Sequence, residues 1–344
     1  KGTITSDVTL AAGNTYKLSG EYIVEEGATL HIEEGVKIIA VYDDIADYIL
    51  VKQGGKINAV GTPDKPIVMT SEKEEPGAWG GIHICGRAHT NAEGGKGSSE
   101  IGGAVYGGND DADNSGTLQY IRLEYTGFAF DEEHEANGIS FYGVGNGTIV
   151  DHCQAYKGSD DGFEFFGGSV NVSNLVAVSC SDDSFDWTEG WNGKGTNLVA
   201  YQEAESTLGY DCDCLMECDN NGSNNAATPV AHPVLKNLIL VGNGGSKQGI
   251  RLRAGTEVEI DNAKVCGKGQ PLTVETALTE NALKNGTSKL TNITLTSELS
   301  CKEGIYTHAD FIAVTSNKVD ANLSYSSFED IRKECSWMNG SWVK

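Results

Sequence analysis

The chain has 344 residues and a formal net charge of −24, with 44 glycines against only 6 prolines and 3 methionines. This charge excludes nucleic acid as a partner, because phosphates are bound by lysine and arginine, and it disfavours polyanionic sugars unless a cation bridges the two negative surfaces. No apolar run approaches the roughly 18 residues that a membrane span requires, and the start at Lys1 without a signal peptide is expected of a mature or trimmed form.

Short apolar runs that stop at glycine fill residues 16–70. Each run alternates between apolar and polar residues for a few positions, as at residues 28–32 and 55–61. This pattern is typical of half-buried strands separated by tight turns. A glycine-rich succession of such strands favours an all-β, single-stranded right-handed parallel β-helix, in which each coil covers its neighbour.

Residues 86–117 interrupt the coils with glycine, asparagine, aspartate and serine. Few residues of this segment are suited to a core, so we interpret it as a loop inserted at the side of the solenoid, where repeat proteins place variable and often functional segments.

The end of this insertion resembles half of a calcium-binding loop. Asp111, Asp113 and Ser115 supply oxygen atoms at alternate positions, and a glycine follows at the sixth position. Arg122 stands where the bidentate glutamate belongs, so Asp131, Glu132 or Glu133 would have to complete the site. The motif predicts Ca²⁺ at Asp111, Asp113 and Ser115, and a solvated acidic loop is the alternative.

The most informative motif is a duplication. The sequence SDDGFEF at residues 159–165 recurs as SDDSFDW at residues 181–187, a separation of 22 residues that suits one coil of a β-helix. Adjacent coils lie about 4.8 Å apart, so the two acidic pairs should stack as a ladder of carboxylates. The ladder comprises Asp160, Asp161, Asp182 and Asp183, with Glu164 and Asp186 beside it.

Three roles remain open for this ladder. Stacked carboxylates raise one another's pKa and so provide an acid beside a base, which is the machinery of glycoside hydrolysis. They also suit a cation, and aspartate before glycine or serine is common turn chemistry. The catalytic candidates are Asp161, Asp182 and Asp183, and Glu164 and Asp186 are candidate substrate-binding residues.

Aromatic residues crowd the same coils. Trp187 and Trp191 would form a stacking platform for sugar rings if they face solvent, and an aromatic stack inside the solenoid if they face inward. We assign them to substrate binding together with Glu164 and Asp186.

A second insertion is expected near residues 203–231, followed by further coils to about residue 267. It contains Cys212, Cys214 and Cys218, whose spacing favours disulfides over a zinc site completed by Asp211, Asp213 and His232. Cys153 and Cys180 lie in strand-like runs and are expected to be buried as small apolar side chains.

The C-terminal part is less regular. We expect the β-helix to span residues 1–270, with coils and an irregular capping segment over residues 271–344, because an open solenoid end leaves strand edges unpaired. Helices are expected near residues 273–284 and 327–333, where helix formers precede a glycine or follow acidic residues.

Several runs identify a wider resemblance. The segments GATLHIEEG at residues 27–35, IVMTS at 67–71 and WGGI at 79–82, with the duplicated acidic coils, resemble secreted right-handed parallel β-helix proteins of the pectate-lyase-like superfamily. They are similar in particular to cell-envelope lipoproteins of Bacteroidetes and some proteobacteria. The resemblance covers about residues 16–265 and implies an extracellular or cell-envelope protein that binds or processes polysaccharide.

A narrower resemblance is to pectinases of the polygalacturonase type. Asp161 would match their first aspartate, Asp182 and Asp183 their pair, and Arg251, within GIRLR at residues 249–253, their substrate-binding cation. The sequence departs from that pattern because no Gly-His-Gly follows the pair. The resemblance leaves three possibilities: a carbohydrate-binding surface protein, a pectinase-like hydrolase, and a structural or adhesive scaffold with calcium in its acidic turns.

Overall fold

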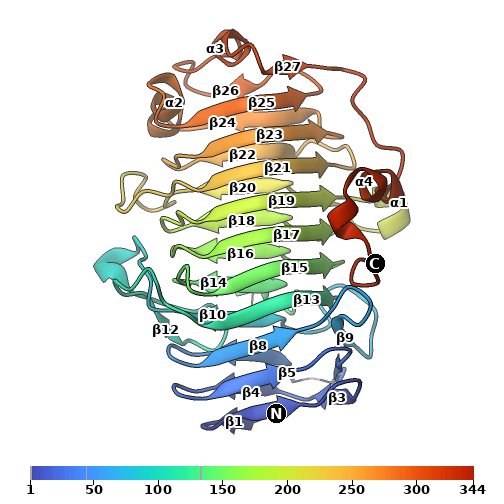
Figure 1. Ribbon diagram of the computed structural model, residues 1–344. Coiled ribbons are helices and arrows are strands. Elements are labelled where there is room, and N and C mark those ends of the chain that lie inside the picture. The colour runs from blue at the N-terminus through green and yellow to red at the C-terminus, as the bar shows by residue number, and fades with distance from the viewer. Residues whose placement is uncertain (1, 44, 132–133) are drawn as a thin grey trace.

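The structure, a computed structural model, describes residues 2–43, 45–131 and 134–344 and is a right-handed parallel β-helix (Figure 1). Two long sheets of parallel strands run along the molecule, an 11-stranded sheet A and a 14-stranded sheet B. The predicted fold class is confirmed.

The strands of sheet A, in spatial order, are β1 (Gly2–Ile4), β4 (Glu21–Val24), β7 (Tyr48–Val51), β10 (Ile82–Cys85), β14 (Ile139–Tyr142), β16 (Phe163–Phe166), β18 (Phe185–Thr188), β20 (Met216–Asp219), β22 (Gln248–Arg253), β24 (Gln270–Val274) and β26 (Ser300–Cys301). The main path of sheet B is β2 (Val8–Leu10), β5 (Thr29–Ile32), β8 (Lys56–Val60), β13 (Gly116–Glu124), β15 (Ile149–Tyr156), β17 (Asn171–Val178), β19 (Lys194–Tyr201), β21 (Val234–Val241), β23 (Glu259–Cys266), β25 (Lys289–Leu295) and β27 (Lys318–Val319), with β3 (Thr15–Leu18), β6 (Lys37–Ala40) and β9 (Ile67–Ser71) beside it.

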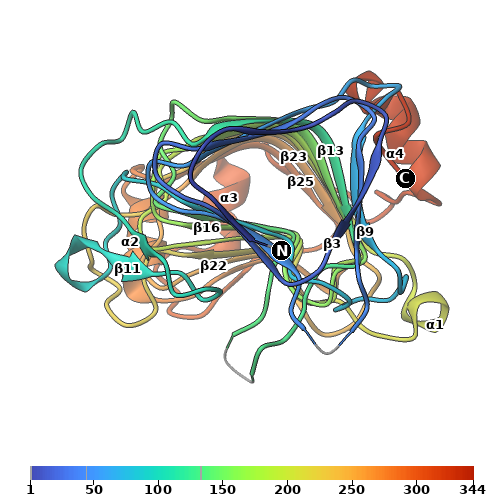
Figure 2. The same cartoon turned by 90° about the horizontal axis from the view of Figure 1, so that it is seen from below.

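Sheet B bends along one line, which gives the coil its three-sided outline in Figure 2. In the first coils two separate strands occupy the two sides of this bend, and β13 pairs with both of them, with β8 through residues 116–119 and with β9 through residues 121–123. From β13 onward one long strand makes the bend through a single residue with positive φ, beginning with Tyr120 and His152.

Asparagine takes over this bend position in the later coils. Asn174, Asn197, Asn237, Asn262 and Asn292 have φ between 56° and 65°, a left-handed conformation that asparagine tolerates better than most residues. Each side-chain amide bonds to the coil before it: Asn237 Nδ2 donates to Asn197 Oδ1 at 3.1 Å, and Asn262 Nδ2 to Asn237 Oδ1 at 2.9 Å. We call this row the asparagine ladder.

Replacing Asn237 by valine should destabilise the protein more than replacing it by glycine. Both changes remove the ladder hydrogen bonds, but only valine also pays about 1–2 kcal/mol for the left-handed backbone. Urea denaturation of the two variants measures the difference. Equal losses would show that backbone conformation contributes nothing at this bend.

The first insertion is packed more closely than the sequence suggests. It holds the short helix η1 (Glu93–Gly95) and an antiparallel pair, β11 (Gly97–Ser98) and β12 (Val105–Tyr106), which lie to one side of the solenoid in Figure 2. Ile101 and Tyr106 are buried against Tyr142 and Phe166 on the outer face of sheet A. The segment is therefore anchored by its own apolar cluster, which the interpretation of residues 86–117 as a side loop with few core residues missed.

The second insertion is only partly an insertion. Residues 203–231 include α1 (Glu205–Leu208), but they also include β20, which pairs with β18 and β22 within sheet A. The coil pattern therefore continues through a segment that was expected to be an insertion.

The C-terminal part combines a cap with a strap. Coils continue to β27, and the helices α2 (Ala277–Lys284) and α3 (His308–Ala313) lie at that end of the solenoid (Figure 1). The last residues, with α4 (Phe328–Glu334) and η2 (Ser336–Met338), run back along sheet B to the level of β13, where Ser341 N donates to Pro63 O at 2.8 Å. We call residues 328–344 the strap. The two expected helices are present, but the second belongs to this strap and not to an end cap.

All nine cysteines are free thiols, so the disulfides expected for Cys212, Cys214 and Cys218 are absent. Cys153 and Cys180 are fully buried, as predicted. No helix within the described residues is both long and apolar enough to cross a membrane.

Candidate functional site

A row of polar side chains lies on the outer face of sheet A. The strand pairing aligns Ser140 with Glu164, which is followed by Asp186, Glu217 and Arg251 in the next three coils. The residues before and after each row member face the core, because successive side chains of a strand point to opposite faces. The 22-residue duplication therefore places Glu164 and Asp186 beside each other, as predicted.

The turns before these strands add a second set of carboxylates. Asp161 and Asp183 hold equivalent places in successive coils and are 5% and 4% exposed. Each accepts a hydrogen bond from the next coil: Asp183 N donates to Asp161 Oδ1 at 2.8 Å, and Cys214 N donates to Asp183 Oδ1 at 2.7 Å. These bonds give Asp161 and Asp183 a role in turn structure, whereas Asp182 is exposed.

The two sets of carboxylates converge. Asp161, Glu164 and Asp186 each place one oxygen so that the three atoms lie within 4.8 Å of one another, and Asp183, Asp186 and Glu217 form a similar group. Two more groups adjoin these, one of Asp160, Asp161 and Asp182 and one of Asp183, Asp213 and Cys214. We call these nine residues the acidic cluster. The structure thus brings together five predicted site residues: Asp161, Glu164, Asp182, Asp183 and Asp186.

Several carboxyl groups of the acidic cluster have raised pKa values. Burial raises the pKa of Asp161, Glu164, Asp183 and Asp186 well above the ordinary carboxylate range, and repulsion from neighbouring carboxylates raises it further. For Asp160 burial and the charge of Asp182 raise the pKa to about 8. At neutral pH this cluster therefore favours bound protons or a bound cation over free charge.

Arg251 is already paired with acids at the end of the row. Its Nη1 lies 3.0 Å from Glu217 Oε1 and its Nη2 lies 3.3 Å from Glu275 Oε2. Arg253 beside it pairs with Glu217 and Asp219. A substrate carboxylate at Arg251 would therefore have to compete with two protein carboxylates, so the predicted role of a free anchor does not match the structure.

Asn137 lies between Ser140 and Glu164 at one end of the cluster. Its side chain is 1% exposed, and Nδ2 donates to Glu164 Oε2 at 2.6 Å and to Ser140 Oγ at 2.9 Å. Its Oδ1 is buried and has no hydrogen-bond partner among the described residues. A buried acceptor without a partner is costly unless a ligand meets it.

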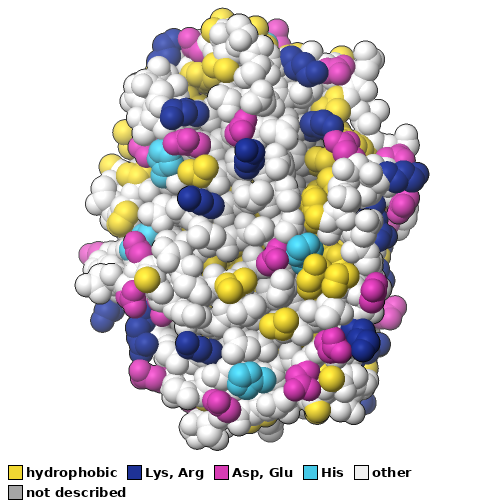
Figure 3. Space-filling model, viewed as in Figure 1, with side chains coloured by type: hydrophobic (Ala, Val, Ile, Leu, Met, Phe, Trp, Pro, Cys, Tyr) yellow, Lys and Arg dark blue, Asp and Glu magenta, His cyan; other side chains and the backbone are white. Residues whose placement is uncertain are grey.

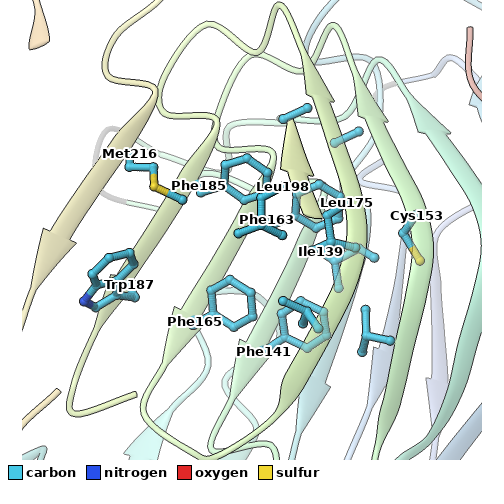
Figure 4. Close-up of a cluster of buried hydrophobic side chains, with 14 of the residues drawn as sticks. Ile139, Phe141, Cys153, Phe163, Phe165, Leu175, Phe185, Trp187, Leu198 and Met216 are labelled. Atoms are coloured by element: carbon cyan, nitrogen blue, oxygen red, sulfur yellow. The ribbon is translucent and has the colours of Figure 1, made fainter. Parts of the chain in front are cut away.

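Trp187 and Trp191 lie inside the solenoid and not on its surface. Each is 1% exposed, and Figure 4 shows Trp187 among the core side chains. The Trp191 ring stacks on Phe165 with centroids 4.1 Å apart. The predicted stacking of these two residues on sugar rings is therefore wrong. Alternation along β18 turns Trp187 inward and Asp186 outward, whereas Trp191 lies after the end of β18 and is buried against Phe165.

The predicted calcium loop lies apart from this cluster. Asp111 Oδ1 lies 2.7 Å from His89 Nδ1, whereas Asp113 Oδ2 accepts from Ser115 Oγ at 3.3 Å. Neither aspartate belongs to any group of three or more potential metal ligands within the described part of the chain, and Glu132 and Glu133 fall outside it. Calcium at Asp111, Asp113 and Ser115 stays a prediction that the geometry of the loop does not favour.

Sequence reasoning missed Glu217 and considered Asp213 only as a zinc ligand; these two acids complete two of the four groups. The signal available for Glu217 was a repeated pattern of an apolar, a charged and an apolar residue. It occurs in FEF, in FDW and in MEC, which begins at Met216. The geometry does not favour zinc with His232, because His232 bonds to Glu257 and Glu259, at 2.8 and 3.3 Å, and belongs to no group of potential metal ligands with the cysteines among the described residues.

Comparison with known proteins gives one match. A family model described as a pectate-lyase-like beta helix domain matches residues 2–343. No curated protein and no solved structure matches the chain.

Proposed function

Because the chain belongs to the pectate-lyase-like β-helix family, we propose that it binds an acidic polysaccharide through divalent cations held by the acidic cluster. The observation that carries this proposal is the convergence of carboxylate oxygens from Asp161, Glu164, Asp183, Asp186 and Glu217. An extracellular or cell-envelope location accords with such a ligand.

The donor set of the cluster fits calcium. Carboxylate oxygens are the ligands that Ca²⁺ prefers, and two oxygens about 2.4 Å from one ion are at most about 4.8 Å apart. Asp161, Glu164 and Asp186 meet this condition, as do Asp183, Asp186 and Glu217. Asn137 supports this arrangement by donating Nδ2 to Glu164 Oε2, which holds one of the carboxylates in place.

A cation explains how so acidic a chain attracts an acidic sugar. The formal net charge of −24 repels a polyuronate, and the two arginines nearest the cluster are paired with its own acids. A bound divalent ion supplies the positive charge that these arginines do not, and its remaining coordination positions are open to sugar carboxylates. The row runs across successive strands, so the polymer would lie along the axis of the solenoid.

The test compares Asp186→Asn with Asp111→Asn, a matched substitution in the predicted calcium loop. Isothermal titration with Ca²⁺ should show at least about tenfold weaker binding for Asp186→Asn, because Asp186 belongs to two of the ligand groups. Retention on immobilised polygalacturonate should need Ca²⁺ and disappear with EDTA.

Asp111→Asn should leave both measurements unchanged, and loss of Ca²⁺ binding in that variant alone would overturn the assignment. Reducing ends that appear with the wild type but not with Asp182→Asn would show that the protein also hydrolyses its ligand, through the exposed aspartate of the cluster.

A further inference from the structure

A hollow lies between sheet B and the strap, away from the acidic cluster on the outer face of sheet A. Its volume is about 400 Å³, within the range of small-molecule sites. Figure 2 places the strap helix α4 beside sheet B, away from the outer face of sheet A. The residues that line the hollow include none of the acidic cluster.

One wall of the hollow is the asparagine ladder. Asn197, Asn237 and Asn262 line it, and the strand register places them in one row. Each side-chain amide uses one N–H for the ladder bond, so the second N–H of each remains for a ligand. In the adjacent row Val199 and Ile239 give the floor an apolar strip.

The other wall comes from the strap. Trp337 lines the hollow and is partly exposed. Its ring is held against the buried Trp342, with ring centroids 6.3 Å apart. Lys264 and Glu334 pair with each other at the rim, so the lining carries no unpaired charge among the described residues.

We propose that this hollow binds an uncharged sugar unit, with Trp337 stacking on the ring and the amides of the asparagine ladder bonding its hydroxyl groups. An aromatic face, an apolar strip and a row of neutral amides match a ring that has an apolar face and hydroxyls on its edge. Figure 3 views this side of the molecule, where hydrophobic side chains lie along the strap and uncharged atoms predominate on the adjoining face.

Charge separates this site from the acidic cluster. The carboxylate of a uronate would add no affinity in this hollow, because Lys264 is already neutralised by Glu334 and the rest of the lining is uncharged. A neutral sugar needs no cation, so binding at the hollow should be independent of Ca²⁺. The inference does not depend on the function proposed for the acidic cluster.

The experiment titrates the wild type with neutral gluco-, xylo- and manno-oligosaccharides in EDTA, following tryptophan fluorescence and calorimetry. Trp337→Ala should weaken binding by about tenfold, as expected for a lost stacking contact. Asn262→Gly removes an amide yet tolerates the positive φ of that position, and it should weaken binding severalfold.

Two controls separate binding from folding. Trp337→Phe keeps an aromatic ring against Trp342 and should retain most of the affinity, and Asp186→Asn should leave it unchanged. No binding of any neutral oligosaccharide by the folded wild type, or equal affinity in the wild type, Trp337→Ala and Asn262→Gly, would overturn the proposal.

Discussion

Replacing Trp187 by alanine should lower the free energy of unfolding by about 3–5 kcal/mol, as expected for a large aromatic side chain lost from a packed core. Trp187 is 1% exposed, and its Nε1 donates to Thr256 Oγ1 at 3.1 Å, so the change also leaves a buried hydroxyl without its donor. Urea denaturation followed by circular dichroism measures the loss.

The control for this prediction is Ile149→Ala. Ile149 is 55% exposed, so its truncation should change stability by no more than about 0.5 kcal/mol. If Trp187→Ala instead abolished polysaccharide binding while losing less than about 1 kcal/mol, the ring would have to reach the surface and the core assignment would be wrong.

Without divalent cations, the protein should be more stable at pH 5 than at pH 8. The folded state raises the pKa of Asp160, Asp161, Glu164, Asp183 and Asp186, whereas in the unfolded chain carboxylates titrate near pH 4. Between these values the folded state binds more protons than the unfolded state, so stability falls as the pH rises. Each unit of pKa elevation is worth about 1.4 kcal/mol.

Thermal unfolding in EDTA from pH 5 to pH 8 checks this dependence. Glu164→Gln combined with Asp186→Asn should flatten the profile and raise Tm at pH 8 by at least about 2 °C, because two crowded charges are gone. Glu34→Gln, a change on an exposed ion pair with Lys65, should leave the profile as in the wild type. A wild-type stability that rises from pH 5 to pH 8 would contradict the assignment.

The repeat length in the sequence predicted which residues lie side by side in neighbouring coils. It did not predict which side chains point into the core and which point outward. The 22-residue duplication was enough to align Glu164 with Asp186, because parallel pairing preserves the order of equivalent residues. It did not reveal which residues face inward, so Trp187 was assigned to the surface. The core contacts of the whole coil decide which of two alternate sets of side chains points inward. In FDW, Phe185 and Trp187 form one set and Asp186 belongs to the other, and the motif alone does not show which set is buried.

Irregular spacing explains the other misses. Glu217 lies one coil after Asp186 but 31 residues further along the chain, because α1 and its loop lengthen that coil. The strap was recognised only as a helix near residues 327–333, since nothing local in its sequence indicates which distant strands it covers. The asparagine ladder is visible in the sequence as an asparagine followed by an aliphatic residue in each of its coils. This pattern could be interpreted only once the bend in sheet B was known.

The strap has a consequence for how the molecule unfolds. In a solenoid each coil touches only its neighbours, so stability is a sum of local terms and unfolding can begin at either end. The strap adds contacts between coils that are otherwise remote: Glu334 pairs with Lys264, Lys344 N donates to Gln154 Oε1 at 2.8 Å, and Ser341 N bonds to Pro63 O. These contacts tie the coils between Pro63 and Lys264 to one another, so we expect this part of the solenoid to unfold as one cooperative unit and not coil by coil.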